Sequence, residues 1–113
     1  MARSVLPRGY FRDTATVYTR AANGQFTVVH EADLACRVDP IDLGGAPTGG
    51  ARSELAARRA MQYPADYTLP TGSQVLAEGL RWNPINVNAP QPAVRDPITG
   101  AVEAYQVELV RAA

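Results

Sequence analysis

The side chains that most often carry out catalysis are scarce in this sequence. It contains one histidine, His30, and one cysteine, Cys36. A hydrolase triad needs a nucleophile, a base and an acid that orients the base, and only His30 offers the base. Both residues fall in segments with the alternation of strands, where a structural histidine and an inert buried thiol are the ordinary roles. We therefore predict no catalytic residue.

Metal and phosphate sites lack the necessary ligands as well. One cysteine and one histidine do not make a structural zinc site. Asp39 and Asp42 offer carboxylates for a weak cation site, although aspartate is also common in turns. The run GGAPTGGARS has glycines at the spacing of a phosphate-binding loop, but Ala51-Arg52 stands where that loop requires Lys followed by Ser or Thr. We predict that the protein is not an enzyme and binds no metal or cofactor.

The composition is that of a globular domain. The chain has 113 residues, of which 46% are hydrophobic and 19% charged, so we expect one domain. No apolar run is long enough to cross a membrane, and Val5-Leu6 is too short for the core of a signal peptide. We therefore expect synthesis in the cytoplasm and no membrane partner. A net charge of zero argues against a protein whose main task is to grip phosphates.

Alternating hydrophobic patterns predict several short strands. Residues 14–21 and 25–30 flank Asn23-Gly24, a strong hairpin signal. A two-residue turn there pairs Ala22 with Gln25, Thr19 with Val28, Tyr18 with Val29, and Val17 with His30. The apolar face of this hairpin then comprises Ala15, Val17, Ala21, Phe26 and Val28. The next strand alternates Leu34, Cys36 and Val38 toward one side, and Pro40 ends it.

The only tryptophan, Trp82, is expected in the core because it shares its side of a strand with Leu80. The alternative is a binding surface beside Arg81. Ile85 and Val87 alternate out of phase with this pair, so we predict a one-residue bulge at Asn83-Pro84. The last strand covers residues 101–110.

Two segments do not follow the strand pattern. Residues 1–12 form a basic arm, which is either a frayed end or a contact for a partner. Residues 41–60 hold two Gly-Gly pairs and Pro47, and a loop of about 20 residues is usually functional or disordered. Residues 53–60 are compatible with a short helix capped by Ser53.

These patterns predict an all-β fold. We expect a small, bent antiparallel β-barrel or sandwich of about six to seven strands, with a long Gly-rich loop and room for one short helix. Residues 13–113 form this single domain, residues 1–12 are its arm, and the 41–60 loop is inserted in it.

In this order, the segments resemble the head-completion or stopper proteins of tailed bacteriophages, which form the head–tail connector beneath the portal. The resemblance extends from about residue 13 to residue 111. It rests on DTATVYTR as the opening strand, on ACRVDP, and on the Gly-rich insertion. It continues through YPADYTLPTGSQV and GLRWNPINV to the closing YQVELVR. The Asn83-Pro84 interruption departs from a plain strand.

The resemblance implies a virion protein of the neck, assembled in the host cytoplasm. Its copies would form a homo-oligomeric ring, expected to be hexameric, between the portal or adaptor ring above and a tail-side ring below. The 41–60 loop would reach into the channel and help retain packaged double-stranded DNA; a plain surface loop is the alternative. The residues expected in this channel loop are Gly44, Gly45, Gly49, Gly50, Arg52, Arg58 and Arg59. Those expected in ring contacts are Arg3, Arg8, Tyr10, Phe11 and Arg12.

Two other functions stay open. One is a different ring of the same neck or tail, such as a tail terminator. The other is a single-stranded nucleic-acid-binding module of the OB type, which stacks bases on aromatic side chains in a basic groove.

Overall fold

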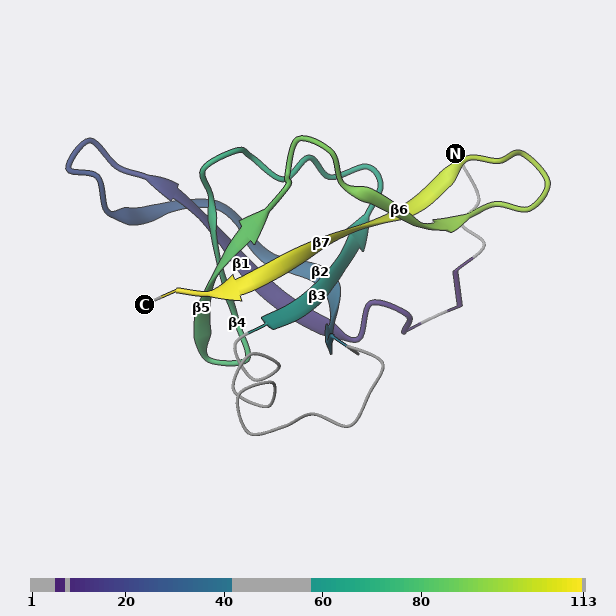
Figure 1. Cartoon of the computed structure of the whole chain (residues 1–113), viewed down its shortest axis with the longest axis horizontal. Helices are drawn as coiled ribbons and strands as arrows, with labels where there is room; N and C mark the ends of the chain where they lie inside the picture. The colour runs from purple at the N-terminus through teal and green to yellow at the C-terminus, as the bar shows by residue number, and fades with distance from the viewer. Residues whose placement is uncertain (1–5, 8, 42–57, 113) are drawn as a thin grey trace.

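The computed structural model describes residues 6–7, 9–41 and 58–112 (Figure 1). In these residues the chain forms strands and no helix. The strands are β1 (Asp13–Arg20), β2 (Phe26–Pro40), β3 (Arg58–Pro64), β4 (Gln74–Ala77), β5 (Leu80–Ile85), β6 (Gln91–Arg95) and β7 (Val102–Arg111).

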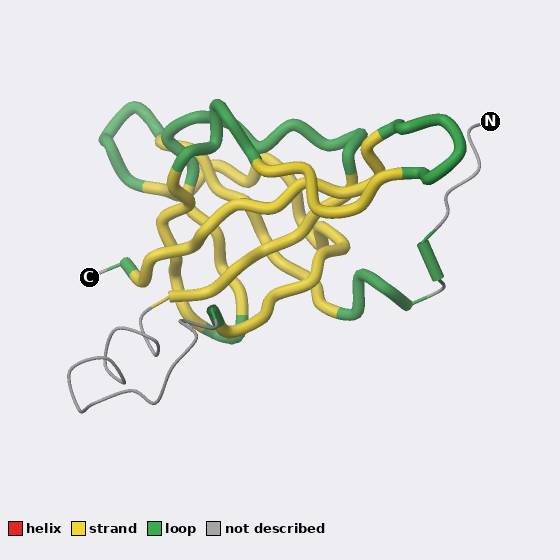
Figure 2. The backbone as a smooth tube through the Cα atoms, turned by 45° about the vertical axis from the view of Figure 1, so that its right-hand side comes forward, coloured by secondary structure: helices red, strands yellow, loops and turns green. Residues whose placement is uncertain are grey.

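Six of the strands close into an antiparallel barrel. The order around it is β1, β2, β3, β7, β5 and β4, and β4 pairs with β1 again. β6 is the additional strand, and it pairs with the half of β7 that β5 does not reach. Figure 2 shows the strands wrapping around the interior. The prediction of a small β-barrel of six to seven strands is confirmed.

The barrel interior is filled by alternating residues from its strands. Trp82 is fully buried there, and its indole N–H donates to the carbonyl oxygen of Ala77 at 3.0 Å. The predicted inward residues of β2, Leu34, Cys36 and Val38, are all buried. The predictions of a core tryptophan and of a strand with one apolar side are therefore confirmed. The other large, fully buried side chains are Tyr63, Met61, Leu109, Val17 and Val75.

The first hairpin forms where Asn23-Gly24 predicts it, but with a different turn. The Gly24 N–H donates to the carbonyl of Ala21, and the Ala21 N–H donates to the carbonyl of Gln25. The loop therefore has three residues, with Gly24 in the left-handed region at φ 84°. The prediction that Ala22 pairs with Gln25 is wrong.

The predicted register holds only in the middle of this hairpin. Thr19 lies opposite Val28 and Tyr18 opposite Val29, as expected. Bulges then shift the pairing, so Val17 faces Glu31 and not His30. The predicted apolar face is correct for Ala15 and Val17, which are buried. It is wrong for Val28, which is 47% exposed because this part of the hairpin projects beyond the barrel (Figure 1).

The predicted bulge at Asn83-Pro84 is wrong. β5 pairs with β7 in unbroken register from Trp82 opposite Arg111 to Ile85 opposite Glu108. β4 pairs only with residues 80–82, so Pro84 lies where β5 has one open edge, and a strand tolerates proline there. The chain turns instead at Asn86, whose φ is 58°, and Val87 then packs against the core.

The end of the predicted 41–60 loop also needs correction. β3 begins at Arg58, so residues 58–60 belong to the barrel and not to a loop or helix. Residues 42–57, with the expected helix cap Ser53, lie outside the described residues. Pro40 lies opposite Arg59, so β2 and β3 hold the two ends of the connection side by side.

The buried indole generates a first prediction. Trp82→Ala should lower the free energy of unfolding by about 3–5 kcal/mol, because a large side chain is removed from a packed core. Denaturant unfolding of wild type and variant measures it. Ile98→Ala, at a position 92% exposed, is the control and should change stability little. A change near zero for Trp82→Ala would contradict the role of the indole in the core.

Candidate functional site

The single histidine and the single cysteine do not form a reactive pair. His30 is exposed on β2, and its Nδ1 is hydrogen-bonded to the Tyr67 hydroxyl at 2.8 Å. Cys36 is fully buried, and burial raises the pKa of its thiol to about 12, with a smaller contribution from the charge of Asp13. A thiol that stays protonated at neutral pH is a poor nucleophile. In the described part of the chain, no group of three or more His, Cys, Asp or Glu side chains is arranged to hold a metal ion.

The end of the basic arm lies on the barrel wall. The Tyr10 hydroxyl donates to Gln62 Oε1, and the guanidinium of Arg37 lies 5.1 Å from the Tyr10 ring centroid. Arg12 Nη2 donates to Asp39 Oδ1 in an ion pair. These contacts tie residues 10–12 to β2 and β3, so this part of the arm is not a frayed end.

Arg12 also sets the charge state of its partner. Its hydrogen bond is the largest influence that holds the pKa of Asp39 below the ordinary value, against the opposing effect of desolvation. Arg37 adds a second bond to the same carboxylate at 3.0 Å. The arm contacts predicted for a ring neighbour, Tyr10 and Arg12, are thus used within the chain. Phe11 packs edge-on against Tyr10 with ring centroids 5.3 Å apart. Arg3 and Arg8 lie outside the described residues.

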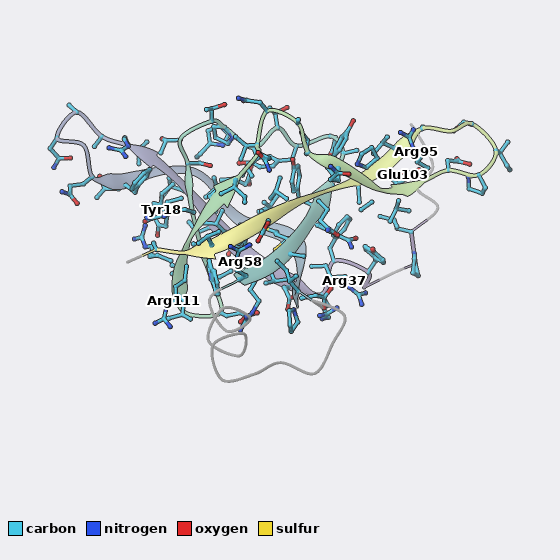
Figure 3. The ribbon with its side chains drawn as sticks, in the orientation of Figure 1. Tyr18, Arg37, Arg58, Arg95, Glu103 and Arg111 are labelled. Atoms are coloured by element: carbon cyan, nitrogen blue, oxygen red, sulfur yellow. The ribbon has the colours of Figure 1, made fainter. Side chains whose placement is uncertain are left out.

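The two arginines predicted at the end of the channel loop belong to the barrel wall. Arg58, labelled in Figure 3, forms an ion pair with Glu108 of β7 at 2.7 Å. Arg59 lies 3.4 Å from a carboxylate oxygen of Glu78, and its guanidinium is 5.3 Å from the centroid of the Trp82 ring. The remaining predicted loop residues, Gly44, Gly45, Gly49, Gly50 and Arg52, lie outside the described residues.

Arginines cover several of the aromatic rings. Besides the Tyr10 and Trp82 contacts, Arg81 lies 4.1 Å from the centroid of Tyr18 and Arg20 lies 4.7 Å from that of Phe26. A base that stacks on a ring needs one of its faces. Tyr18 and Phe26 are the aromatic residues of the projecting hairpin, and each already has one face occupied.

Three tyrosines outside these pairs line a groove of about 490 Å³, which we call the tyrosine groove. It lies between the segment that follows β3 and the loop between β5 and β6, which run along the top of Figure 1. No charged side chain lines it, so it is suited to an uncharged group. Its lining residues are Tyr63, Ala65, Tyr67, Thr68, Leu69, Pro70, Thr71, Val87, Asn88, Pro90 and Tyr105.

The charge of the tyrosine groove is fixed at neutral pH. Burial raises the pKa of Tyr67 to about 12, and the nearby charge of Glu31 contributes to the rise. Burial also raises the pKa of Tyr63. Their hydroxyls therefore stay protonated and offer hydrogen bonds without adding charge.

The hairpin between β6 and β7 carries the most exposed large hydrophobic side chain of the described residues. We call residues 96–100 the isoleucine tip, because Ile98 is 92% exposed there. The Asp96 carboxylate accepts from the N–H of Ile98 at 2.8 Å, and the Asp96 carbonyl accepts from the N–H of Gly100 at 2.8 Å. The tip is therefore a well-bonded turn with an apolar side chain at its end.

Sequence reasoning missed both the tyrosine groove and the isoleucine tip. The groove is formed by residues far apart in the chain, so no local pattern indicates it. The tip had a usable signal: in DPITG, Asp-Pro and Thr-Gly are turn formers, and an isoleucine between them has no neighbouring strand to cover it.

No family model, curated protein or solved structure matches the chain. Over the described residues, no helix has the length and apolarity needed to cross a membrane. The resemblance to stopper proteins therefore stays a prediction from the sequence.

The Asp39 contact generates a prediction about pH. Asp39→Asn should destabilise the protein above about pH 4. The folded state lowers the pKa of Asp39 below its ordinary value of 3.8, so the ionised carboxylate stabilises the fold wherever it is already ionised in the unfolded chain. That stability is lost as the pH falls through the lowered folded pKa, so wild type and variant should converge in acid. Urea unfolding at a series of pH values measures the difference. Asp66→Asn, at an exposed position, is the control, and a difference for Asp39→Asn that is independent of pH would contradict the prediction.

Proposed function

We propose that this protein is a structural ring component of the head–tail connector of a tailed bacteriophage. In this proposal it is the stopper or head-completion ring that closes the DNA channel below the portal or adaptor and provides the docking surface for the tail. The observation that carries the proposal is a barrel filled by its own side chains, with two hairpins that project from opposite ends (Figure 1).

The filled interior supports an assembly role. Trp82, Met61 and Leu109 are fully buried inside the barrel, where a ligand-binding barrel keeps a cavity. The groups available for binding are therefore on the outside. The β1–β2 hairpin exposes Val28 and Val29, and the β6–β7 hairpin exposes Ile98. In our proposal these exposed apolar side chains are covered by neighbouring subunits in the assembly.

The position of the β2–β3 connection also suits a ring. β2 and β3 are antiparallel neighbours with Pro40 opposite Arg59, so their connection starts and ends at one end of the barrel. Symmetry would place this end identically in every copy of a ring. In our proposal it faces the packaged DNA, with Arg58 and Arg59 at its base.

Reconstitution tests the proposal directly. Purified protein added to DNA-filled heads that lack tails should bind to them and slow the release of DNA, measured by nuclease sensitivity. Binding to purified tails, with none to heads, would instead identify a tail terminator. Tight binding to single-stranded oligonucleotides with a steep dependence on salt would favour the OB-type alternative.

A deletion tests the part of the proposal that concerns the connection. Removing residues 44–52 should leave the unfolding midpoint nearly unchanged, because loop length affects stability slowly and the two strands stay paired. The same variant should still bind to heads but retain less DNA than the wild type. A variant that fails to fold would show that the segment is needed for the barrel. Full retention of DNA by the variant would contradict the proposed position of the segment in the channel.

A further inference from the structure

The isoleucine tip is built to present one side chain. The Ala101 N–H donates to the Thr99 hydroxyl at 3.2 Å, and Arg95 Nη1 donates to the Gly100 carbonyl at 3.0 Å, in addition to the bonds of Asp96. A single exposed apolar side chain is common on protein surfaces. Here the side chain stands on a turn that is already ordered, so the tip itself would lose little conformational entropy when a partner covers it.

Arg95 adds a charge to this apolar end. It is exposed and forms no ion pair with any described residue, although Glu103 lies on the neighbouring strand of the same hairpin (Figure 3). The Asp96 carboxylate is directed at the backbone N–H groups of Ile98 and Thr99. The tip therefore offers a partner an isoleucine and a guanidinium that has one hydrogen bond, to the Gly100 carbonyl, and no ion pair within the described residues.

The tyrosine groove provides the complementary features. Its lining is uncharged, and the exposed acid Glu31 lies at its edge. Glu31 follows His30, whose Nδ1 is hydrogen-bonded to the Tyr67 hydroxyl at 2.8 Å, and its charge acts on Tyr67. Glu31 forms no ion pair within the described residues. An apolar side chain with an arginine next to it therefore matches a neutral groove with an acid at its edge.

We propose that the isoleucine tip of one copy docks in the tyrosine groove of a second copy of this chain, with Arg95 facing Glu31. The tip and the groove are different surfaces, so each copy uses one to bind a neighbour and offers the other to the next. Such a heterologous contact produces rings when the rotation closes. The inference rests on the proposed function, because it identifies the contact between ring neighbours.

A symmetric contact between two isoleucine tips is less favourable. It would bring Arg95 of one copy toward Arg95 of the other, and like charges that face each other repel. It would also leave the tyrosine groove without an occupant. The distribution of charge therefore favours tip against groove over tip against tip.

Cysteine cross-linking tests the geometry of the contact. Ile98→Cys and Thr68→Cys place thiols on the tip and on an exposed residue of the groove, while the native Cys36 is buried. A mixture of the two variants under mild oxidation should form a covalent dimer about tenfold faster than either variant alone, because bound thiols have a high effective concentration. A mixture of Ile98→Cys with Arg111→Cys, at an exposed site on another part of the barrel, is the control.

The same experiment distinguishes this inference from the proposed function when it is run with free protein and with protein on DNA-filled heads. Retention of DNA without the mixed cross-link would overturn the inference and leave the proposed function standing. Cross-linking in solution by a protein that does not bind to heads would support the contact and overturn the proposed function.

A cross-linked pair of Ile98→Cys chains that forms as fast as the mixture would show a symmetric contact. Cross-linking of Ile98→Cys to another neck protein on heads, in place of Thr68→Cys, would assign the tip to that partner. Each of the last two results would overturn the inference.

Substitutions test the energetics. Ile98→Asp should weaken self-association at least about 30-fold, as expected when a central anchor is lost, while the unfolding midpoint stays unchanged. Ile98→Val should associate nearly as well as the wild type.

The charge pair is tested separately. Arg95→Glu should weaken association about 2- to 5-fold, and mixing the Arg95→Glu variant with the Glu31→Arg variant should restore the contact. Unchanged association of Ile98→Asp, measured by analytical ultracentrifugation, would overturn the inference.

Discussion

The pairing of β3 with β7 is the constraint on which the rest of the structure depends. These strands are distant in sequence, yet they pair continuously from Arg58 opposite Val110 to Pro64 opposite Ala104. Without this pairing the remaining strands form an open sheet, with β3 and β7 exposing their edges. With it, the sheet closes and the side chains that point inward are buried from solvent in one core.

Closure also positions the outer features. Tyr63 lies opposite Tyr105 across the β3–β7 pair, and both rings line the tyrosine groove. Gln62 precedes Tyr63 and points to the opposite side of β3. Its side-chain oxygen accepts a hydrogen bond from the Tyr10 hydroxyl and so anchors the arm. One strand pair thus holds a groove on one side and the docked arm on the other.

The distribution of charge follows from the filled interior. Trp82 buries its ring and satisfies its N–H internally, and charged groups remain at or near the surface. Arg58 and Arg12 find acids there, and Arg37 and Arg81 cover aromatic rings. Arg95 is exposed and forms no ion pair with any residue that the structure describes, so its charge stays available on the β6–β7 hairpin.

The sequence by itself determined the strand character of the chain, the first hairpin, the burial of Trp82 and Cys36, and the all-β class, with a barrel and a sandwich both left open. These properties follow from alternation over a few residues, which the side chains enforce locally. It misplaced the turn at Gly24, the bulge at Pro84 and the start of β3. Each depends on which strand lies alongside. The closure of the sheet into a barrel and the tyrosine groove were decided only by the tertiary structure, because each depends on which distant segments of the chain lie side by side. The turn residues around Ile98 are visible in the sequence, but the distance of this turn from the rest of the barrel is not.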